Sequence, residues 1–154
     1  MFICTGNICR SPLAHAVLNH LIKQEGLTDR VEVESSGTSA YHVGESADSR
    51  MRQTALSHGV DIKNYSKKLT RGFIEEYDLL LTMDSSNYRD TLSLCRTPEE
   101  KNKVIMFREF DPEGYGDVPD PWYGGMDGFE EVWEITWRTC NVLFDKIKKD
   151  LNIY

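Results

Sequence analysis

The chain has 154 residues, of which 40% are apolar and 28% are charged, a balance that excludes a disordered or fibrous protein. Its length is typical of one domain over residues 1–154, with enough core to fold without a disulfide or metal scaffold. The formal net charge of −7, from 18 basic and 25 acidic side chains, argues against a general nucleic-acid or anionic-membrane binder.

The first third of the chain alternates short strand patterns with helical ones. We predict a strand over 1–3, a helix from Ser11 to about Gly26, a strand over 31–34, a loop over 35–44 and a helix over 47–58. Ser11 is the expected cap of the first helix, with Pro12 at its first position. The later helix is expected to turn Met51, Ala55 and Leu56 inward.

The rest of the chain continues this alternation. We predict a helix over 70–76, a strand over 77–83, a helix over 84–94, a strand over 104–107, a long loop over 108–126 and a helix over 128–151. Thr70 and Asp84 are the expected caps of their helices. The last helix is expected to bury one stripe of side chains: Phe129, Val132, Trp133, Trp137, Cys140, Phe144 and Ile147.

Strands that alternate with helices indicate an α/β fold. The strand over 77–83 is apolar almost throughout, as is typical of a parallel strand covered on both faces. We therefore predict a single-domain three-layer sandwich, with a four-stranded parallel sheet flanked by helices.

The cysteines and the hydropathy indicate where the protein acts. No run of about 18 apolar residues predicts a membrane span, and the start of the chain lacks the basic and apolar pattern of a secretory signal. We therefore expect a cytoplasmic protein whose cysteines are reduced. Cys95 and Cys140 are expected to be structural, and the four histidines show no metal-ligand spacing with the cysteines, so no metal or other cofactor is expected.

The most informative segment lies between the first strand and the first helix. It reads Cys4-Thr5-Gly6-Asn7-Ile8-Cys9-Arg10-Ser11-Pro12. A glycine-containing loop at a helix N-terminus can turn its backbone N–H groups inward to bind an anion, and Arg10 can grip two oxygens of a phosphate. The same field stabilises a thiolate on Cys4. The alternative is a buried cysteine in a strand-to-helix turn; nucleotide hydrolysis on a P-loop is disfavoured because no Gly-Lys-Ser/Thr follows.

This segment resembles the signature of the low-molecular-weight protein tyrosine phosphatases. A second, distant match is Asp120-Pro121-Trp122-Tyr123-Gly124, which is similar to the general-acid loop of that family. Further matches, which extend the resemblance over nearly the whole chain, are 35–39, Gly44, 48–50 and 83–87.

The resemblance implies a two-step phosphoryl transfer without a metal. Cys4 would attack phosphorus to form a phosphocysteine, while Arg10 would bind the phosphate oxygens together with the loop residues Thr5, Gly6, Asn7, Ile8 and Cys9. Ser11 would donate a hydrogen bond to the sulfur. Asp120 would protonate the leaving phenolate and then act as base on water. The implied substrates are phosphotyrosine-containing proteins or small aryl phosphates, hydrolysed at mildly acidic pH by a protein expected to be a monomer.

The resemblance also implies roles around the loop. Asn7 would hold the loop conformation, with Ser35 as its partner. Tyr41, Trp122 and Tyr123 would form aromatic walls for a planar phenyl ring, although the last two can also be simple loop anchors. Asp84 is either a helix cap or a support near the loop. Asp120 alone would be read as an ordinary Asp-Pro turn, and its interpretation depends on the cysteine motif.

Cys9 has two interpretations, a small buried residue or a resolving thiol that traps oxidised Cys4 as a reversible disulfide. The sequence also departs from the family at three places, one of which is the loop over 108–119, of variable type, for which the resemblance implies nothing. Only three residues precede Cys4 where the family normally has several more, which we expect to affect stability more than chemistry. A histidine that often supports the loop is replaced near 64–65.

Three rival functions share these features. Thiol-coupled arsenate reductases add a pair of relay cysteines, whereas the corresponding region here holds only Cys95. Protein-arginine phosphatases favour threonine where this chain has Ile8, with a less aromatic acid loop. A non-catalytic phosphopeptide-binding module needs neither Cys4 nor Asp120. We therefore predict a tyrosine phosphatase.

Overall fold

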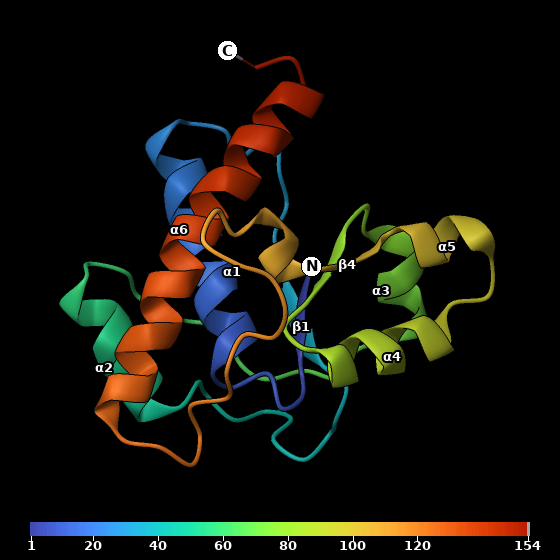
Figure 1. Ribbon diagram of the computed structural model, residues 1–154. Coiled ribbons are helices and arrows are strands. Elements are labelled where there is room, and N and C mark those ends of the chain that lie inside the picture. Colours follow the sequence, from blue (N-terminus) through green and yellow to red (C-terminus); the bar gives the residue numbers. More distant parts are fainter. Residues whose placement is uncertain (154) are drawn as a thin grey trace.

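The centre of the molecule is a parallel sheet with strand order β2-β1-β3-β4 (Figure 1). The structure is a computed structural model and describes residues 1–153, so the last residue of the expected domain 1–154 lies outside the described residues. The strands are β1 (Phe2–Cys4), β2 (Ser35–Gly37), β3 (Leu80–Thr82) and β4 (Val104–Met106).

Helices cover both faces of this sheet (Figure 1). One layer holds α1 (Arg10–Gln24), α2 (Ser49–Ser57) and α6 (Met126–Asp150), and the other holds α3 (Arg71–Glu76), α4 (Ser85–Leu94) and α5 (Pro98–Asn102). Side chains of β1 alternate between the layers: Phe2 joins the core beneath α1 and α6, and Ile3 joins the core on the opposite face. The predicted α/β three-layer sandwich with a four-stranded parallel sheet is therefore confirmed.

The sheet gathers chemically useful residues at one edge. β1 is central and ends at Cys4, which is in register with Gly37 at the end of β2. On its other side Ile3 is in register with Thr82, so Asp84 follows β3 at the same edge. Ligand sites of open parallel sheets form beyond the carboxyl ends of the strands, which is the edge described here.

The second strand lies further along the chain than predicted. Residues 31–34, which alternate between apolar and polar, form no strand; the carbonyl of Glu34 accepts a hydrogen bond from the N–H of Phe2 at 2.9 Å. The parallel ladder instead runs through Ser35–Gly37, whose residues are small. Close packing requires the glycine at the end of this strand, because a Cβ atom at Gly37 would lie 2.6 Å from the carbonyl oxygen of Thr5. Packing has overridden the β-propensity of the preceding residues.

Helix boundaries show both agreement and error. Thr70 and Asp84 cap α3 and α4 by accepting backbone N–H bonds, as predicted. Ser11 does not cap the first helix: α1 begins at Arg10 without a side-chain cap, and Ser11 lies within it. The predicted strand over 77–83 is paired only at Leu80–Thr82.

Two side chains expected in the core are exposed. Leu56 is 57% exposed because α2 buries the stripe of Met51, Thr54 and Ala55, which follows helical spacing more closely. Trp137 is 37% exposed and lies over Trp133, at 5.7 Å between ring centroids.

Two short elements were not predicted. α5 begins after Thr97, which accepts the N–H of Glu100, with Pro98 in the first turn. A 3₁₀ turn, η1 (Phe107–Phe110), occupies the start of the predicted long loop. None of the helices formed by residues 1–153 is long and apolar enough to cross a bilayer.

Candidate active site

The sulfur of Cys4 lies inside the loop that joins β1 to α1. The N–H of Asn7 donates to Sγ at 3.2 Å, and the hydroxyl oxygen of Ser11 is 2.9 Å from Sγ. Asn7 Nδ2 donates to that same Ser11 oxygen at 2.8 Å, which leaves the proton of Ser11 free to point at the sulfur. Both groups therefore favour a negatively charged sulfur.

The loop conformation depends on Asn7, whose φ of 56° lies in the left-handed region. Asparagine tolerates this region better than most residues, and the reversal lets its N–H turn back toward Cys4. The side chain is buried, and its Oδ1 accepts the N–H of Lys67 at 3.0 Å. Nearby, the hydroxyl of Ser66 donates to the carbonyl of Gly6 at 2.9 Å. The segment after residue 64 thus braces the loop from outside.

Arg10 is held by groups from two distant parts of the chain. Its Nη1 donates to Asp84 Oδ2 at 2.7 Å and to the carbonyl of Val118 at 3.0 Å. Burial opposes the charge on Arg10, but Cys4, Asp84 and Asp120 outweigh it and hold the pKa of Arg10 above its ordinary value. With Nη1 occupied, Nη2 is free to contact an anion beside Cys4. Asp84 combines both predicted roles, since its Oδ1 caps α4 while its Oδ2 orients Arg10.

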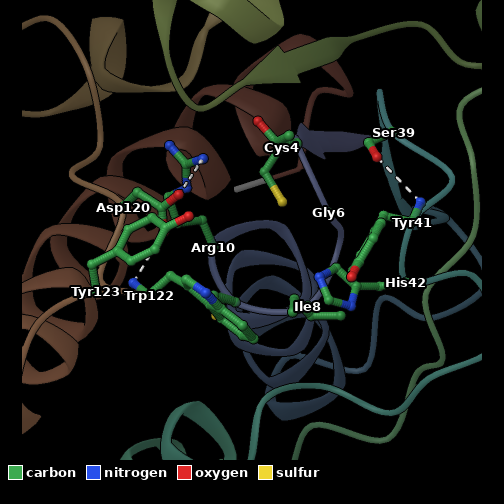
Figure 2. Close-up of a pocket in the computed structure, with 12 residues that line it drawn as sticks. Cys4, Gly6, Ile8, Arg10, Ser39, Tyr41, His42, Asp120, Trp122 and Tyr123 are labelled. Carbon is green, nitrogen blue, oxygen red and sulfur yellow. Dashed lines mark hydrogen bonds and ion pairs between the residues drawn. The ribbon is translucent and has the colours of Figure 1, made fainter.

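Asp120 reaches the same place from the loop before α6. Its Oδ2 is 3.7 Å from Arg10 Nη2, and its Oδ1 accepts the N–H of Trp122 at 3.1 Å. The side chain is 49% exposed, so it meets both solvent and the site. Figure 2 shows Cys4, Arg10 and Asp120 converging from the first loop and the distant acid loop.

These residues line one cavity of about 410 Å³. Its walls are Cys4, Thr5, Gly6, Ile8, Cys9, Arg10, Ser39, Tyr41, His42, Asp120, Trp122 and Tyr123. Ten of these twelve are predicted site residues; Ser39 and His42 are not. Asn7 and Ser11 contact the sulfur of Cys4 without lining the cavity, and Asp84 acts through Arg10.

Aromatic rings form the mouth of the cavity (Figure 2). The ring of His42 lies between Tyr41 and Trp122, at 4.8 and 5.6 Å between centroids. Its Nδ1 is 2.8 Å from Glu45 Oε2, which fixes the ring at the rim. Tyr123 is 92% exposed and stands at the edge of the opening. These aromatic side chains line the same cavity as the buried Cys4 sulfur, and their flat apolar faces suit an aromatic phosphate ester.

Ser35 is placed differently from the prediction. Asn7 is bonded to Ser11 and Lys67, while the buried hydroxyl of Ser35 lies 3.1 Å from His15 Nδ1 and accepts Asn64 Nδ2 at 3.3 Å. His15 comes from α1, whose second turn passes beside β2, so the imidazole reaches Ser35 from the helix. Burial lowers the pKa of His15 from 6.5 to about 4, with Glu34 opposing the shift.

Glutamine in place of His15 is expected to preserve more stability in mild acid. Between pH 6.5 and about 4 the unfolded chain binds a proton at His15 that the folded protein does not. The free energy of unfolding therefore rises with pH in this window. At about pH 5 the titration of His15 makes the native protein less stable than at neutral pH by on the order of 2 kcal/mol. Glutamine keeps a hydrogen-bonding group near Ser35 without titrating.

Denaturant unfolding of His15→Gln and the parent protein at about pH 7 and about pH 5 measures this difference. The variant should lose less stability on acidification than the parent. Equal losses in the two proteins would show that His15 is not the titrating group.

The cysteines fall into separate environments. Burial raises the pKa of the Cys9 thiol, and the negative charge of Asp48 adds to that effect. Of the cysteines in residues 1–153, Cys4 and Cys9 line the cavity, whereas Cys95 ends α4 and Cys140 is buried in α6. Within the same residues no group of three His, Cys, Asp or Glu side chains is placed to hold a metal ion.

Three residues that support the first loop were not among the predicted site residues. Asn87 donates to the Thr5 hydroxyl at 2.9 Å, and its place in the 83–87 match is the one sequence signal for this role. Ser66 and Lys67 sit in a polar stretch that carries no motif. Their partners in the first loop lie 60 residues away in sequence, so local patterns do not reveal them.

Comparison with known proteins agrees with this geometry. Residues 1–153 match the family described as low molecular weight phosphotyrosine protein phosphatase. A low molecular weight protein-tyrosine-phosphatase from Streptomyces coelicolor is 39% identical over 153 residues, which cover 97% of this chain and 93% of that protein. The crystal structure of a protein tyrosine phosphatase from Entamoeba histolytica has a TM-score of 0.92 and 36% identity, covering 97% of this chain and 96% of that chain.

A solved structure of an arginine phosphatase, the Bacillus subtilis protein YwlE with a phosphorylated active site serine, is also similar. It has a TM-score of 0.86 and 27% identity, covering 97% of this chain and 95% of that chain. The resemblance stated from the motifs is confirmed by the family match over the whole described chain. This chain therefore belongs to the low molecular weight phosphotyrosine protein phosphatase family.

Proposed function

We propose that the protein hydrolyses phosphotyrosine in proteins, and small aryl phosphates, through a phosphocysteine on Cys4. The observation that carries this proposal is the convergence of three groups in one cavity: the hydrogen-bonded Cys4 sulfur, Arg10, and the Asp120 carboxyl group. A nucleophile, a cation for the phosphate and a proton donor are the groups that this chemistry needs.

In the first step the Cys4 thiolate attacks phosphorus, an S–P bond forms, and the bond from phosphorus to the phenolic oxygen breaks. Arg10 and the N–H groups of the loop bind the phosphoryl oxygens as charge spreads over them. Asp120, in its protonated form, transfers its proton to the departing oxygen, so the leaving group departs as a neutral phenol. Its position beside Arg10 Nη2 supports this role, because a phosphate held by Arg10 has its ester oxygen near the carboxyl group.

In the second step water attacks phosphorus and the S–P bond breaks. The Asp120 carboxylate accepts the proton of the water, which restores its acid form. The sulfur leaves as a thiolate, stabilised by Ser11 and by the N–H of Asn7. The product is inorganic phosphate, and the site returns to its starting state without a metal or redox cofactor.

The mouth of the cavity supports tyrosine over arginine as the phosphorylated residue. Ile8 lines the cavity where arginine phosphatases favour threonine, and Trp122 supplies a flat wall that a phenyl ring can contact. Arsenate reduction is less well supported because Cys95, the cysteine of the relay region, does not line the cavity. A purely binding role leaves Asp120 without a purpose.

A comparison of three substrates on one preparation tests this function. We expect phosphotyrosine to be hydrolysed rapidly, phosphoarginine slowly, and arsenate not to be reduced when thiol reductant is supplied. The measured quantities are kcat/KM for phosphate release and the rate of arsenite formation. A higher kcat/KM for phosphoarginine would move the assignment to an arginine phosphatase, and arsenite formation would favour a reductase.

We also propose that Cys9 protects Cys4 from irreversible oxidation. Peroxide oxidises the Cys4 thiolate to a sulfenic acid; the Cys9 thiol then displaces water from it to form a disulfide, which added thiol reduces. Both cysteines line the same cavity, which supports the pairing. After peroxide treatment, Cys9→Ser should recover less activity with thiol than the parent protein. Recovery as complete as that of the parent would exclude this role.

The proposed nucleophile indicates the cellular compartment of the protein. Cys4 must be reduced, not part of a disulfide, to attack phosphorus as a thiolate, so we propose that the protein acts in the reducing cytoplasm. We further propose a single domain over residues 1–154 that works as a monomer, with phosphorylated proteins or aryl phosphates rather than nucleic acids or membranes as partners. Sedimentation of the purified protein at several concentrations tests the monomer; a concentration-dependent mass would contradict it.

A further inference from the structure

Arg50 occupies an unusual place between the two loops that form the site. It lies in the first turn of α2, whose cap Asp48 donates its N–H to the carbonyl of Ile8 in the phosphate-binding loop at 2.8 Å. Asp48 also grips the guanidinium of Arg50, with Nε donating to Oδ1 at 3.2 Å and Nη2 to Oδ2 at 3.0 Å. The guanidinium is thus fixed by two bonds to a residue that is itself fixed to the phosphate-binding loop.

The same guanidinium contacts the acid loop. Its Nη2 donates to the carbonyl oxygen of Trp122 at 3.2 Å. Its carbon Cζ lies 5.4 Å from the ring centroid of Trp122 and 4.7 Å from that of Phe129, within the range of cation–π attraction. One side chain therefore contacts the acid loop at Trp122 and the start of α6 at Phe129.

The acid loop has few other attachments. Within residues 1–153, the hydrogen bond from Arg50 is the only one that joins residues 120–123 to a part of the fold outside the loop itself. Asp120 accepts the N–H of Trp122, and Arg50 binds the carbonyl of that same residue. The backbone of Trp122 therefore links the position of Asp120 to that of Arg50.

We propose that Arg50 is a positioning residue that holds the Asp120 carboxyl group at the leaving-group oxygen. This inference rests on the proposed function of Asp120 as general acid. Arg50 does not itself line the cavity, and its hydrogen bond to the acid loop is made to Trp122, so it acts through Trp122. Its loss should impair proton transfer while leaving the binding of phosphate to Arg10 and the loop intact.

Leaving-group dependence tests the proposal. Poor leaving groups need a proton in the transition state, whereas activated ones such as dinitrophenolate hardly do. For Arg50→Gln we expect kcat/KM, which reports the step that expels the leaving group, to fall about tenfold or more with phenyl phosphate and less than about threefold with dinitrophenyl phosphate, since a placed general acid contributes about 10²–10⁴. The inhibition constant of inorganic phosphate should stay within about twofold. Arg50→Lys keeps the positive charge but cannot form the two-pronged contact with Asp48. Its loss of activity with phenyl phosphate should be smaller than that of Arg50→Gln.

Controls separate positioning from general damage. Arg52→Gln removes an arginine of the same helix that binds the carbonyl of Ala47 instead of the acid loop, and should behave as the parent protein. In an Asp120→Asn background, Arg50→Gln should cause little additional loss, because both changes remove one function. Equal losses with all leaving groups, a weakened phosphate affinity, or additive losses in the double variant would each overturn the proposal. If Asp120→Asn alone shows no leaving-group dependence, the general-acid assignment fails instead.

Discussion

Serine in place of Cys4 is expected to abolish turnover of phosphotyrosine, by at least about 10⁴-fold, while phosphate binding survives. A serine hydroxyl stays protonated at neutral pH and cannot provide the anionic nucleophile that the Cys4 sulfur provides. The proposed oxyanion site consists of Arg10 and the loop N–H groups, and Asp84 and Val118 hold Arg10 without involving the sulfur. Kinetic assay with phosphotyrosine and titration with inorganic phosphate measure the two effects separately.

Cys95→Ser is the matched control for this experiment. Cys95 is a half-buried cysteine at the end of α4 that does not line the cavity, so its replacement should leave turnover unchanged. A Cys4→Ser variant that retained full activity would contradict the phosphocysteine mechanism. Loss of phosphate binding together with turnover would show that the substitution had damaged the loop.

Asparagine in place of Asp120 should have the second largest effect. It removes the transferable proton but keeps an oxygen that can accept the N–H of Trp122, so the loop should stay in place. We expect kcat/KM, which reports the step that expels the leaving group, to fall about 10²–10⁴-fold for phenyl phosphate and much less for dinitrophenyl phosphate. Phosphate should bind at least as tightly as in the parent protein, because a negative charge 3.7 Å from Arg10 is removed. Steady-state kinetics across a series of aryl phosphates gives this dependence.

Asp127→Asn supplies the comparison for Asp120→Asn. Asp127 is an exposed carboxylate in the first turn of α6, a few residues beyond the acid loop, and it does not line the cavity. It tests whether loss of any nearby negative charge is enough to slow the reaction. A uniform fall across all leaving groups in Asp120→Asn would argue that Asp120 orients substrate instead of protonating it.

At Ser11, the usual role of serine as a helix cap conflicts with its contact to the Cys4 sulfur. Serine is a favoured helix cap, and α1 lacks a side-chain cap even though Ser11 lies in its first turn. The hydroxyl instead contacts the Cys4 sulfur and accepts a bond from Asn7. The Ser11 hydroxyl therefore serves the Cys4 loop and not the helix N-terminus, which is why the local propensity rule fails here.

Contiguous features could be predicted because their geometry is local. The segment from Cys4 to Pro12 joins a strand to a helix within nine residues, so the loop, Cys4 and the start of the helix that carries Arg10 lie close together. Thr70 and Asp84 were predicted as caps for the same reason, since the groups that they bind lie three residues away. The order of strands and helices likewise follows from hydropathy periods that each span only one element.

Long-range placements depended on packing of the whole chain. The sequence links Asp120 to Cys4 only through the family resemblance. The two segments are more than 100 residues apart, and neither contains a local signal that the chain folds back to bring Asp120 beside Arg10. The bonds of Arg50 to Trp122 and of His15 to Ser35 join side chains that are ordinary in their own surroundings. At Gly37, the last residue of β2, there is no room for a side chain beside the carbonyl of Thr5. Such contacts depend on how the whole core packs, so short-range sequence patterns do not predict them.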